Sequence, residues 1–362
     1  MMIIDSKVFT CKAFLLCMNF SFVISMSQLH DTIFGEYLEF IFSIVGIFFF
    51  VAHYILSAKI QWETLFKTVL LIIVGLIAMM SSGGATLLKL VLFFGITQQV
   101  DRKSILEGYR WSLLIPSAFV AALSLIGAVD LYYSGTKTAI GFGMQNPNTV
   151  PVIVFSIIVA YNLQNEYNIS GRIIATEFIT SFVLYYFCRA RTAGIILVSY
   201  LIGILLFKKT SSIRGIFKPT QYIFVACAGV SILIANLFRS RTIRWLQINS
   251  ILSGRPWAWD LYLTKYGIKF WGQNIDLTIA ALDNAYLRIL VQYGVLTFLI
   301  YLIFFIGISR YAYKNNKIVL LLSIIAYEIY FMAEFGPILI NFCPILMYEA
   351  YLLVNQKKSG EK

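Results

Sequence analysis

About twelve apolar segments, separated by short polar connections, dominate this chain of 362 residues. Runs such as Phe40–Ala52 and Val295–Ile308 are apolar apart from one small hydroxyl residue each, Ser43 and Thr297, whereas the strands of a membrane barrel would alternate apolar and polar residues. Hydrophobic residues make up 59% of the chain and charged residues only 13%. No soluble domain of this size buries so much apolar surface, so the bilayer is the expected solvent. The sequence predicts an all-α integral membrane protein.

The apolar segments predict about twelve transmembrane helices in a single membrane domain over residues 1–362. A helix needs roughly 20 residues to cross a hydrocarbon core of about 30 Å. The segments near 84–99, 149–163 and 192–207 are short for this, and we expect them to be broken or sunk within the helix bundle. The predicted spans lie near residues 8–29, 37–56, 65–81, 84–99, 110–129, 149–163, 172–188, 192–207, 220–237, 285–308, 317–333 and 337–354.

Lys and Arg gather in every second connection, for example in 102–110 and 208–218. Cytoplasmic loops of membrane proteins carry this excess of basic residues. The sequence therefore predicts a multi-pass protein of the cytoplasmic membrane with both termini cytoplasmic. The formal net charge of +12 fits a basic inner face opposite anionic lipid, so it gives no reason to expect nucleic acid as a partner. The outer connections hold few basic residues, and the loop after Asp130 has only Lys137.

Two predicted outer regions break this rule. Arg189 and Arg191 lie between the seventh and eighth predicted spans. The long connection 238–284 begins with three arginines and contains several Trp and Tyr residues, so we expect amphipathic helices in the membrane interface. Because Arg binds phosphate through a rigid fork that is always charged, arginines on this side suggest an anionic ligand.

The first polar motif is Gly141–Thr149, which contains Asn146-Pro147-Asn148. Its composition is typical of a tight turn with capping side chains at a helix start, and a substrate contact is the alternative. Arg191 begins a short span, where the helix N-terminus adds partial positive charge and free N–H groups to an anion site. Arg189 either joins that site or extends to lipid headgroups.

The second polar motif spans the long outer connection, from Ser253–Trp259 to Asp283–Leu287. In one interpretation Arg255 and the tryptophans bind substrate, because aromatic rings suit sugar faces. In the other they anchor the chain in the interface, and Asp283 with Asn284 caps a helix. The sequence leaves both interpretations open.

Four short motifs follow one another in matching topological places: Asn146-Pro147-Asn148; Arg191-Thr192-Ala193; Ser253-Gly254-Arg255 with a following Trp; and Asp283-Asn284-x-Tyr286-Leu287 with a later Gly294. In this order they resemble the O-antigen polymerase and ligase superfamily, and most of all its capsular or exopolysaccharide repeat-unit polymerases. The resemblance covers roughly residues 140–310.

The resemblance implies a GT-C-like glycosyltransferase that works on the outer face without a metal or another cofactor. Such an enzyme joins oligosaccharide repeat units carried on undecaprenyl pyrophosphate. The growing glycan leaves its lipid diphosphate and is transferred to a sugar hydroxyl of the next unit. The implied partners are the lipid-linked oligosaccharide and membrane lipid, with a chain-length regulator and a flippase as further candidates.

The resemblance also assigns residues. Arg191 and Arg255 match the family's essential arginines, and we expect them to converge around one diphosphate. Asp283 is the third predicted catalytic residue; because a carboxylate is a weak base, we expect it to orient the acceptor hydroxyl. Position in the chain, and not the resemblance, adds two candidates: Arg288, one helical turn from Asn284, for the anion site, and Glu334, in the outer Glu-Phe-Gly-Pro turn, for the mouth of the active site. The predicted substrate-binding residues are Arg189, Asn146, Asn148, Asn284, Tyr286, Trp257 and Trp259.

Two alternative functions stay open. An O-antigen-ligase-type transferase would use the same arginines, but ligases tend to have His-Asn where this chain has Asp283-Asn284. A flippase or exporter of lipid-linked sugars would distribute charged residues through a central cavity, whereas here the arginines gather on one predicted face.

Overall fold

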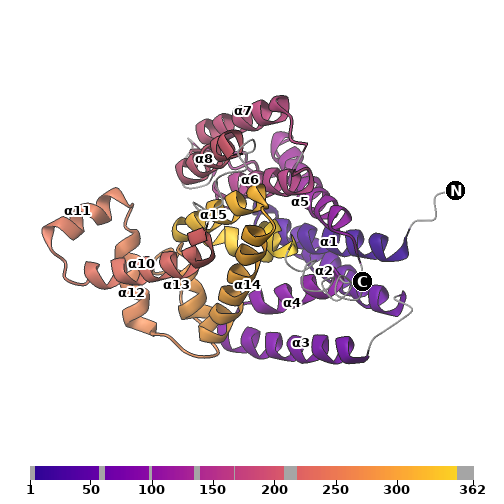
Figure 1. Cartoon of the computed structure of the whole chain (residues 1–362), viewed down its shortest axis with the longest axis horizontal. Coiled ribbons are helices and arrows are strands. Elements are labelled where there is room, and N and C mark those ends of the chain that lie inside the picture. The colour runs from indigo at the N-terminus through magenta and orange to yellow at the C-terminus, as the bar shows by residue number, and fades with distance from the viewer. Residues whose placement is uncertain are drawn as a thin grey trace. The chain divides into compact units, whose positions relative to one another are not determined.

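The computed structural model describes residues 5–56, 62–97, 100–133, 139–166, 168–207 and 218–348. Within these ranges every regular element is a helix, and extended residues pair only in two isolated bridges (Figure 1). The predicted all-α class is confirmed. Lys137, most of the basic segment 208–218 and the end of the last predicted span lie outside the described residues.

The chain forms two compact units, which are described separately. The first comprises Met1–Thr68, Leu92–Leu205 and Ile340–Lys362, and the second comprises Val69–Val91 and Leu206–Leu339. Helices α3 (Trp62–Ser82) and α4 (Thr86–Ile96) contribute residues to both. The other elements of the first unit are α1 (Ser6–Ser25), η1 (Gln28–Asp31), α2 (Ile33–Leu56), α5 (Arg102–Leu125), α6 (Thr149–Gln164), α7 (Gly171–Cys188), α8 (Arg191–Phe207) and η6 (Ile340–Phe342).

The second unit contains most of the later elements. Its helix α13 continues through η4, a single π-helical turn, directly into α14. Its elements are η3 (Lys218–Tyr222), α10 (Ile223–Phe238), α11 (Ile243–Ile251), α12 (Arg255–Tyr266), α13 (Ala285–Arg288), η4 (Ile289–Tyr293), α14 (Gly294–Lys314), α15 (Ile318–Ala333) and η5 (Gly336–Ile338).

Four helical segments among the described residues are long and apolar enough to cross a membrane: Ser6–Ser25, Ile33–Leu56, Lys218–Phe238 and Ala285–Lys314. Shorter apolar helices accompany them, including α6, α8 and α15. Of these, α6 and α8 match the short segments predicted at 149–163 and 192–207. These apolar helices indicate a membrane protein.

Helix α2 presents a continuous apolar face away from its unit. The opposite side of α2 packs on α1, where His53 is buried and its Nδ1 lies 2.9 Å from the Thr10 hydroxyl. Residues three or four apart share one face of a helix. An exposed apolar stripe of this length suits lipid better than water. The stripe consists of Ile33, Tyr37, Phe40, Ile44, Phe48, Val51 and Ile55.

The last predicted span does not begin as a long helix. Residues 336–342 form two short turns, η5 and η6, and a helix starts only at Pro344. Pro344 has no N–H to donate to the Ile340 carbonyl oxygen, so a helix begun at Pro337 could not continue through it. Buried side chains of the first unit bond the irregular segment after Ile340: the Tyr109 hydroxyl donates to the Asn341 carbonyl oxygen (2.8 Å), and the Ser156 hydroxyl donates to that of Phe342 (2.6 Å). The backbone polar groups are thereby satisfied without a helix.

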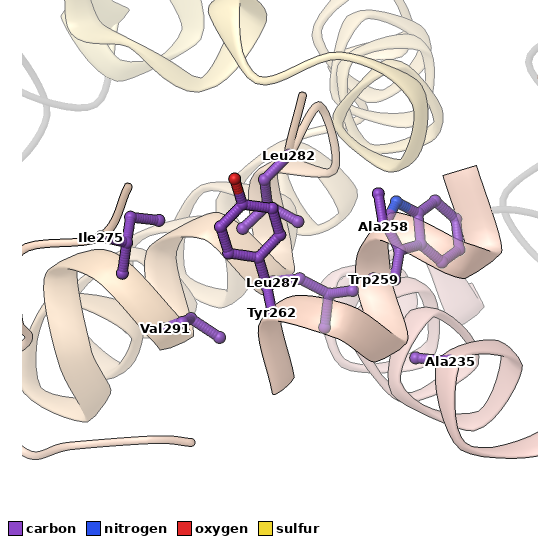
Figure 2. Close-up of a cluster of buried hydrophobic side chains, with 8 residues drawn as sticks. All are labelled: Ala235, Ala258, Trp259, Tyr262, Ile275, Leu282, Leu287 and Val291. Atoms are coloured by element: carbon purple, nitrogen blue, oxygen red, sulfur yellow. The ribbon is translucent and has the colours of Figure 1, made fainter. Parts of the chain in front are cut away.

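The connection 238–284 contains helices α11 and α12, and their position in the membrane interface stays a prediction. Helix α12 buries one side, with Ala258, Trp259 and Tyr262 in an apolar cluster (Figure 2). Tyr262 lies at the centre of this cluster, and its hydroxyl donates to the carbonyl oxygens of Asp276 (2.8 Å) and Ala280 (2.7 Å). In α11, which the structure describes completely, no residue is buried. Helix α12 is therefore the amphipathic helix that positions this connection.

The start of α14 depends on close contact between two backbone segments. The N–H groups of Val295 and Leu296 donate to the carbonyl oxygens of Lys269 (3.0 Å) and Phe270 (3.2 Å), which satisfies donors that a helix N-terminus leaves free. Gly272 and Gly294 have φ of 85° and 87°. A Cβ on Gly294 would collide with the Gly272 nitrogen, and one on Gly272 with the carbonyl oxygen of Gln292.

We predict that Gly272→Ala and Gly294→Ala each destabilise the protein by about 2 kcal/mol or more, because both backbone strain and collision oppose the new methyl group. Thermal unfolding of the purified protein in detergent measures this. Gly229→Ala in α10 is the matched control: no atom lies within 4 Å of its added Cβ, and Ala favours a helix. Equal melting temperatures for all three variants would contradict the prediction.

Candidate active site

Four charged side chains gather in the second unit at the ends of three helices. Arg255 is the first residue of α12, Asp283 lies just before α13, Arg288 is the last residue of α13, and Glu334 directly follows α15. Arg255 contacts Glu334 directly. Asp283 interacts electrostatically with both arginines and with Glu334. We call Arg255, Asp283, Arg288 and Glu334 the arginine–carboxylate cluster.

A tight turn fixes the position of Arg255. Ser253 and Gly254 both have positive φ (57° and 80°), and the Gly254 N–H donates to the carbonyl oxygen of Asn249 over 2.7 Å. Pro256 follows in the first helical turn, where its missing N–H costs no helical hydrogen bond. The Ser-Gly-Arg-Pro sequence therefore ends one helix and starts the next within a few residues, with Arg255 at the start.

Arg255 forms an ion pair with Glu334. Its Nη2 lies 3.2 Å from Glu334 Oε1, and the two side chains are 25% and 12% exposed. The Nε–H of Arg255 is buried and has no acceptor among the described residues. The guanidinium group thus retains a donor that a ligand oxygen can satisfy.

Arg288 is held by an aromatic ring and an amide. Its guanidinium carbon lies 3.9 Å from the ring centre of Phe335, a cation–π contact. Its Nε donates to Gln292 Oε1 over 3.0 Å. Phe335 in turn stacks on Tyr293, with ring centres 6.0 Å apart. Arg288 is therefore fixed beside Asp283 and Glu334 rather than extended to solvent.

Burial and neighbouring charge set the acidity of the two carboxyl groups, both of which lie outside the candidate membrane spans. Burial raises the pKa of Glu334 to about 7; the charge of Asp283 raises it as well, and Arg255 acts in the opposite direction. Burial also raises the pKa of Asp283, while Arg255 and Arg288 lower it. Glu334 is therefore the carboxyl group that changes protonation near neutral pH.

Asn284 and Tyr286, predicted to bind substrate, are fully buried here. Asn284 Oδ1 caps α13 by accepting from the Leu287 N–H (3.0 Å), and its Nδ2 donates to Ser231 Oγ (2.8 Å) and to the Met332 carbonyl oxygen (3.1 Å). The Tyr286 hydroxyl donates to the backbone carbonyl of Glu328 over 2.8 Å. Asn284 thus ties the start of α13 to the end of α15, which brings Asp283 and Glu334 together.

The two predicted tryptophans differ in their surroundings. Trp257 is 43% exposed, whereas Trp259 is 4% exposed and packs in the cluster of Figure 2. Both lie in the first half of α12, two and four positions after Arg255. Trp257 is therefore the one whose ring is open to a ligand.

A second candidate site lies in the first unit. Arg189 and Arg191 line one cleft of about 550 Å³ at the end of α7. The preceding loop docks there, since the Ile140 N–H donates to the carbonyl oxygen of Phe187 over 3.0 Å. Neither guanidinium group has a hydrogen bond or ion pair to a residue that the structure describes. The cleft is lined by Tyr132, Ile140, Tyr185, Tyr186, Phe187, Arg189 and Arg191.

The backbone places Arg189 in an uncommon conformation. It ends α7 with φ 53°, in the left-handed region that Gly usually occupies at a helix C-terminus. Arg191 begins α8 two residues later, and both arginines are exposed. Two exposed guanidinium groups on one aromatic cleft are suited to an anionic ligand.

The Asn-Pro-Asn motif forms the expected turn before α6. Asn146 Oδ1 accepts from the Asn148 N–H (2.8 Å), and the Asn146 carbonyl oxygen accepts from Thr149 N–H (3.0 Å). Asn148 occupies the N-cap position without a capping bond from its side chain. Neither asparagine is among the described residues that line the cleft of Arg189 and Arg191. A substrate contact for this pair stays a prediction.

The structure therefore brings Arg255 and Asp283 together, with Arg288 and Glu334. Arg191 belongs to the first unit and Arg255 to the second, so their convergence on one diphosphate stays a prediction. The aromatic lining of the cleft was not predicted; the run Tyr185–Phe187, which ends two positions before Arg189, was the available sequence signal.

Comparison of the chain with protein-family models, with curated proteins and with solved structures found no match.

We predict that Arg255→Ala makes stability more dependent on pH. Without the guanidinium, the pKa values of Glu334 and Asp283 in the folded protein rise further above those in the unfolded chain. The free energy of unfolding therefore falls as pH increases from the unfolded-state pKa values to the folded-state ones. The added loss at pH 8 is on the order of 2 kcal/mol, measured by thermal unfolding in detergent from pH 5 to 8.

Arg255→Lys, which keeps the charge, restores most of the stability at pH 8. Arg239→Ala is the matched control, because it breaks the pair between Arg239, just after α10, and Asp260 of α12 (2.9 Å), whose side chains are 54% and 12% exposed. Asp260 keeps the Thr264 hydroxyl as a hydrogen-bond donor (3.1 Å), and the exposed arginine is screened by solvent, so we expect a smaller effect. Parallel pH curves for wild type and Arg255→Ala would refute a partnership between Arg255 and these carboxyl groups.

Proposed function

We propose that this protein polymerises oligosaccharide repeat units linked to undecaprenyl pyrophosphate, as a metal-independent glycosyltransferase of the O-antigen polymerase type. The proposal includes about twelve membrane spans in a GT-C-like arrangement, both termini in the cytoplasm, and reaction on the outer face of the cytoplasmic membrane. The observation that carries it is the arginine–carboxylate cluster. Two of the predicted catalytic residues, Arg255 and Asp283, interact electrostatically there, although the rest of α12 and the end of the long connection separate them in the sequence.

The chemistry needs positive charge where the leaving group departs. The acceptor hydroxyl oxygen attacks the anomeric carbon, and the bond between that carbon and the diphosphate oxygen breaks with its electron pair on the diphosphate. Preorganised guanidinium groups stabilise this growing charge. Arg255 and Arg288 supply two such groups, and Asp283 supplies an acceptor that orients the attacking hydroxyl.

The cleft of Arg189 and Arg191 supports the proposal independently. Its guanidinium groups lack described partners, and tyrosine rings lie beside them. Aromatic rings stack on the apolar faces of sugars, and guanidinium groups bind phosphate oxygens. We propose that this cleft binds the sugar–phosphate portion of a lipid-linked substrate.

We predict that Arg255→Ala and Arg191→Ala each lower the polymerisation rate by about 10²–10³-fold, the usual effect of losing one preorganised charge donor. Replacement of the chromosomal copy in the native host, followed by electrophoresis of surface polysaccharide, measures chain length. Short or absent polymer is expected, at wild-type levels of the protein in the membrane. Arg244→Ala in α11 is the control, since Arg244 is exposed and lies outside both sites.

Normal long-chain polymer from both stably expressed variants would end the proposal. Loss of glycan attachment at unchanged chain length would replace polymerisation with a ligase-type transfer. Transport of lipid-linked sugar across vesicle membranes without formation of a glycosidic bond would replace it with a flippase.

The double variant Arg191→Ala/Arg255→Ala tests whether the two arginines serve one chemical step. Residues that act as a unit are strongly non-additive. We predict a loss close to that of the worse single variant, measured as the polymerisation rate of membranes supplied with lipid-linked repeat units. A loss equal to the product of the two single effects would assign the arginines to separate steps.

A further inference from the structure

The geometry of the arginine–carboxylate cluster points to Glu334 as the general base of the transfer reaction, held inactive by Arg255 until a diphosphate binds that guanidinium group. This inference rests on the proposed function and adds a residue role to it. Glu334 would accept the proton of the attacking sugar hydroxyl and so takes the acceptor position first proposed for Asp283, whose negative charge raises the proton affinity of Glu334.

The ion pair itself provides the switch. In the empty site the Arg255 Nη2 is 3.2 Å from Glu334 Oε1, and Arg255 Nε has no described acceptor. Diphosphate oxygens carry more negative charge than one carboxylate and match the guanidinium fork. An incoming diphosphate therefore takes Arg255 as its own partner, and Glu334 loses its nearest positive charge.

The surroundings of Glu334 determine what this loss does. Asp283, at the start of α13, and the Tyr330 side chain, on α15 itself, interact with it electrostatically, and Arg288 lies against the adjoining Phe335. With Arg255 withdrawn and a diphosphate added, the neighbouring negative charge favours protonation. The carboxylate thus becomes a stronger base only when the donor substrate is in place.

In the proposed step one proton is transferred, one bond to the anomeric carbon forms and another breaks. The hydroxyl O–H bond breaks and its proton moves to the Glu334 carboxylate. The freed oxygen lone pair forms the bond to the anomeric carbon, and the anomeric carbon–oxygen bond to the diphosphate breaks with its electrons on the diphosphate, next to Arg255. The pKa of about 7 for Glu334 in the empty site lies near the optimum for a base at neutral pH.

The test uses purified full-length protein in liposomes, supplied with lipid-linked repeat units extracted from the native host lacking this chain. We expect Glu334→Gln to lower kcat/KM at pH 7.5 by at least about 100-fold, the lower range for loss of a general base. Binding of undecaprenyl pyrophosphate, the sugar-free product, should be as tight as in wild type or tighter, because the competing carboxylate is gone. Asp260→Asn is the matched control, since Asp260 also pairs with an arginine of the second unit.

The pH profile separates a base from a purely structural partner. Wild-type kcat/KM should rise as pH increases through about 7, where Glu334 loses its proton in the enzyme without substrate. Glu334→Gln should abolish this rise, and Asp283→Asn should shift it to lower pH by removing a neighbouring negative charge. If Asp283→Asn abolishes the rise instead, Asp283 is the base and the inference fails.

Two further outcomes are decisive. If Glu334→Gln loses undecaprenyl pyrophosphate binding together with turnover, Glu334 only positions Arg255 and the inference is overturned. If Glu334→Gln keeps wild-type turnover and pH dependence, it is overturned as well. Absence of polymer from wild-type protein, with repeat units that intact native membranes do polymerise, would overturn the proposed function instead.

Discussion

The structure depends on one constraint, that backbone polar groups cannot remain unpaired where water is absent. Long helices such as α1 and α2 meet it with internal hydrogen bonds. Where prolines prevent a helix, buried side chains take over: Tyr109 and Ser156 bond the carbonyl oxygens of the turns after Ile340. Asn341 completes this arrangement by donating to Asn19 Oδ1 over 2.7 Å, and Asn19 donates to Ser112 Oγ over 2.6 Å. Polar residues deep in the first unit thus serve as substitutes for helical pairing.

The same constraint places the chemistry at helix ends. Charged groups are costly inside hydrocarbon, and helix termini bring backbone donors and acceptors to the surface of the apolar region. Arg255, Asp283 and Glu334 all occupy the first residue of a helix or the positions just outside one. The apolar cluster of Figure 2 fixes α12 and the segment around α13 in the second unit. The charged site therefore lies on helices that a packed apolar cluster holds in place.

The fold class and most helix positions could be predicted, because hydropathy and charge act locally along the chain. The last span was predicted to begin near residue 337, but its helix begins at Pro344, because proline positions outweighed apolar composition. For the site, residue types and order led to Arg255 and Asp283, but the pairing of Arg255 with Glu334 spans 79 positions and depends on tertiary packing. Burial likewise separated residues that looked equivalent in sequence: Asn284 and Trp259 face inward, whereas Trp257 is half exposed. The left-handed Arg189 had no sequence signal, since Arg rarely occupies such a position.

The composition of the arginine–carboxylate cluster has a consequence for selectivity. With both carboxyl groups ionised, the charges of two guanidinium groups and two carboxylates sum to zero, so the empty site is electroneutral. It therefore attracts small anions such as chloride or inorganic phosphate only weakly at long range. An anion gains entry only if it displaces a carboxylate from its guanidinium. Multivalent groups with several oxygens do this best, which favours a membrane-tethered diphosphate over the far more abundant ions in the surrounding fluid.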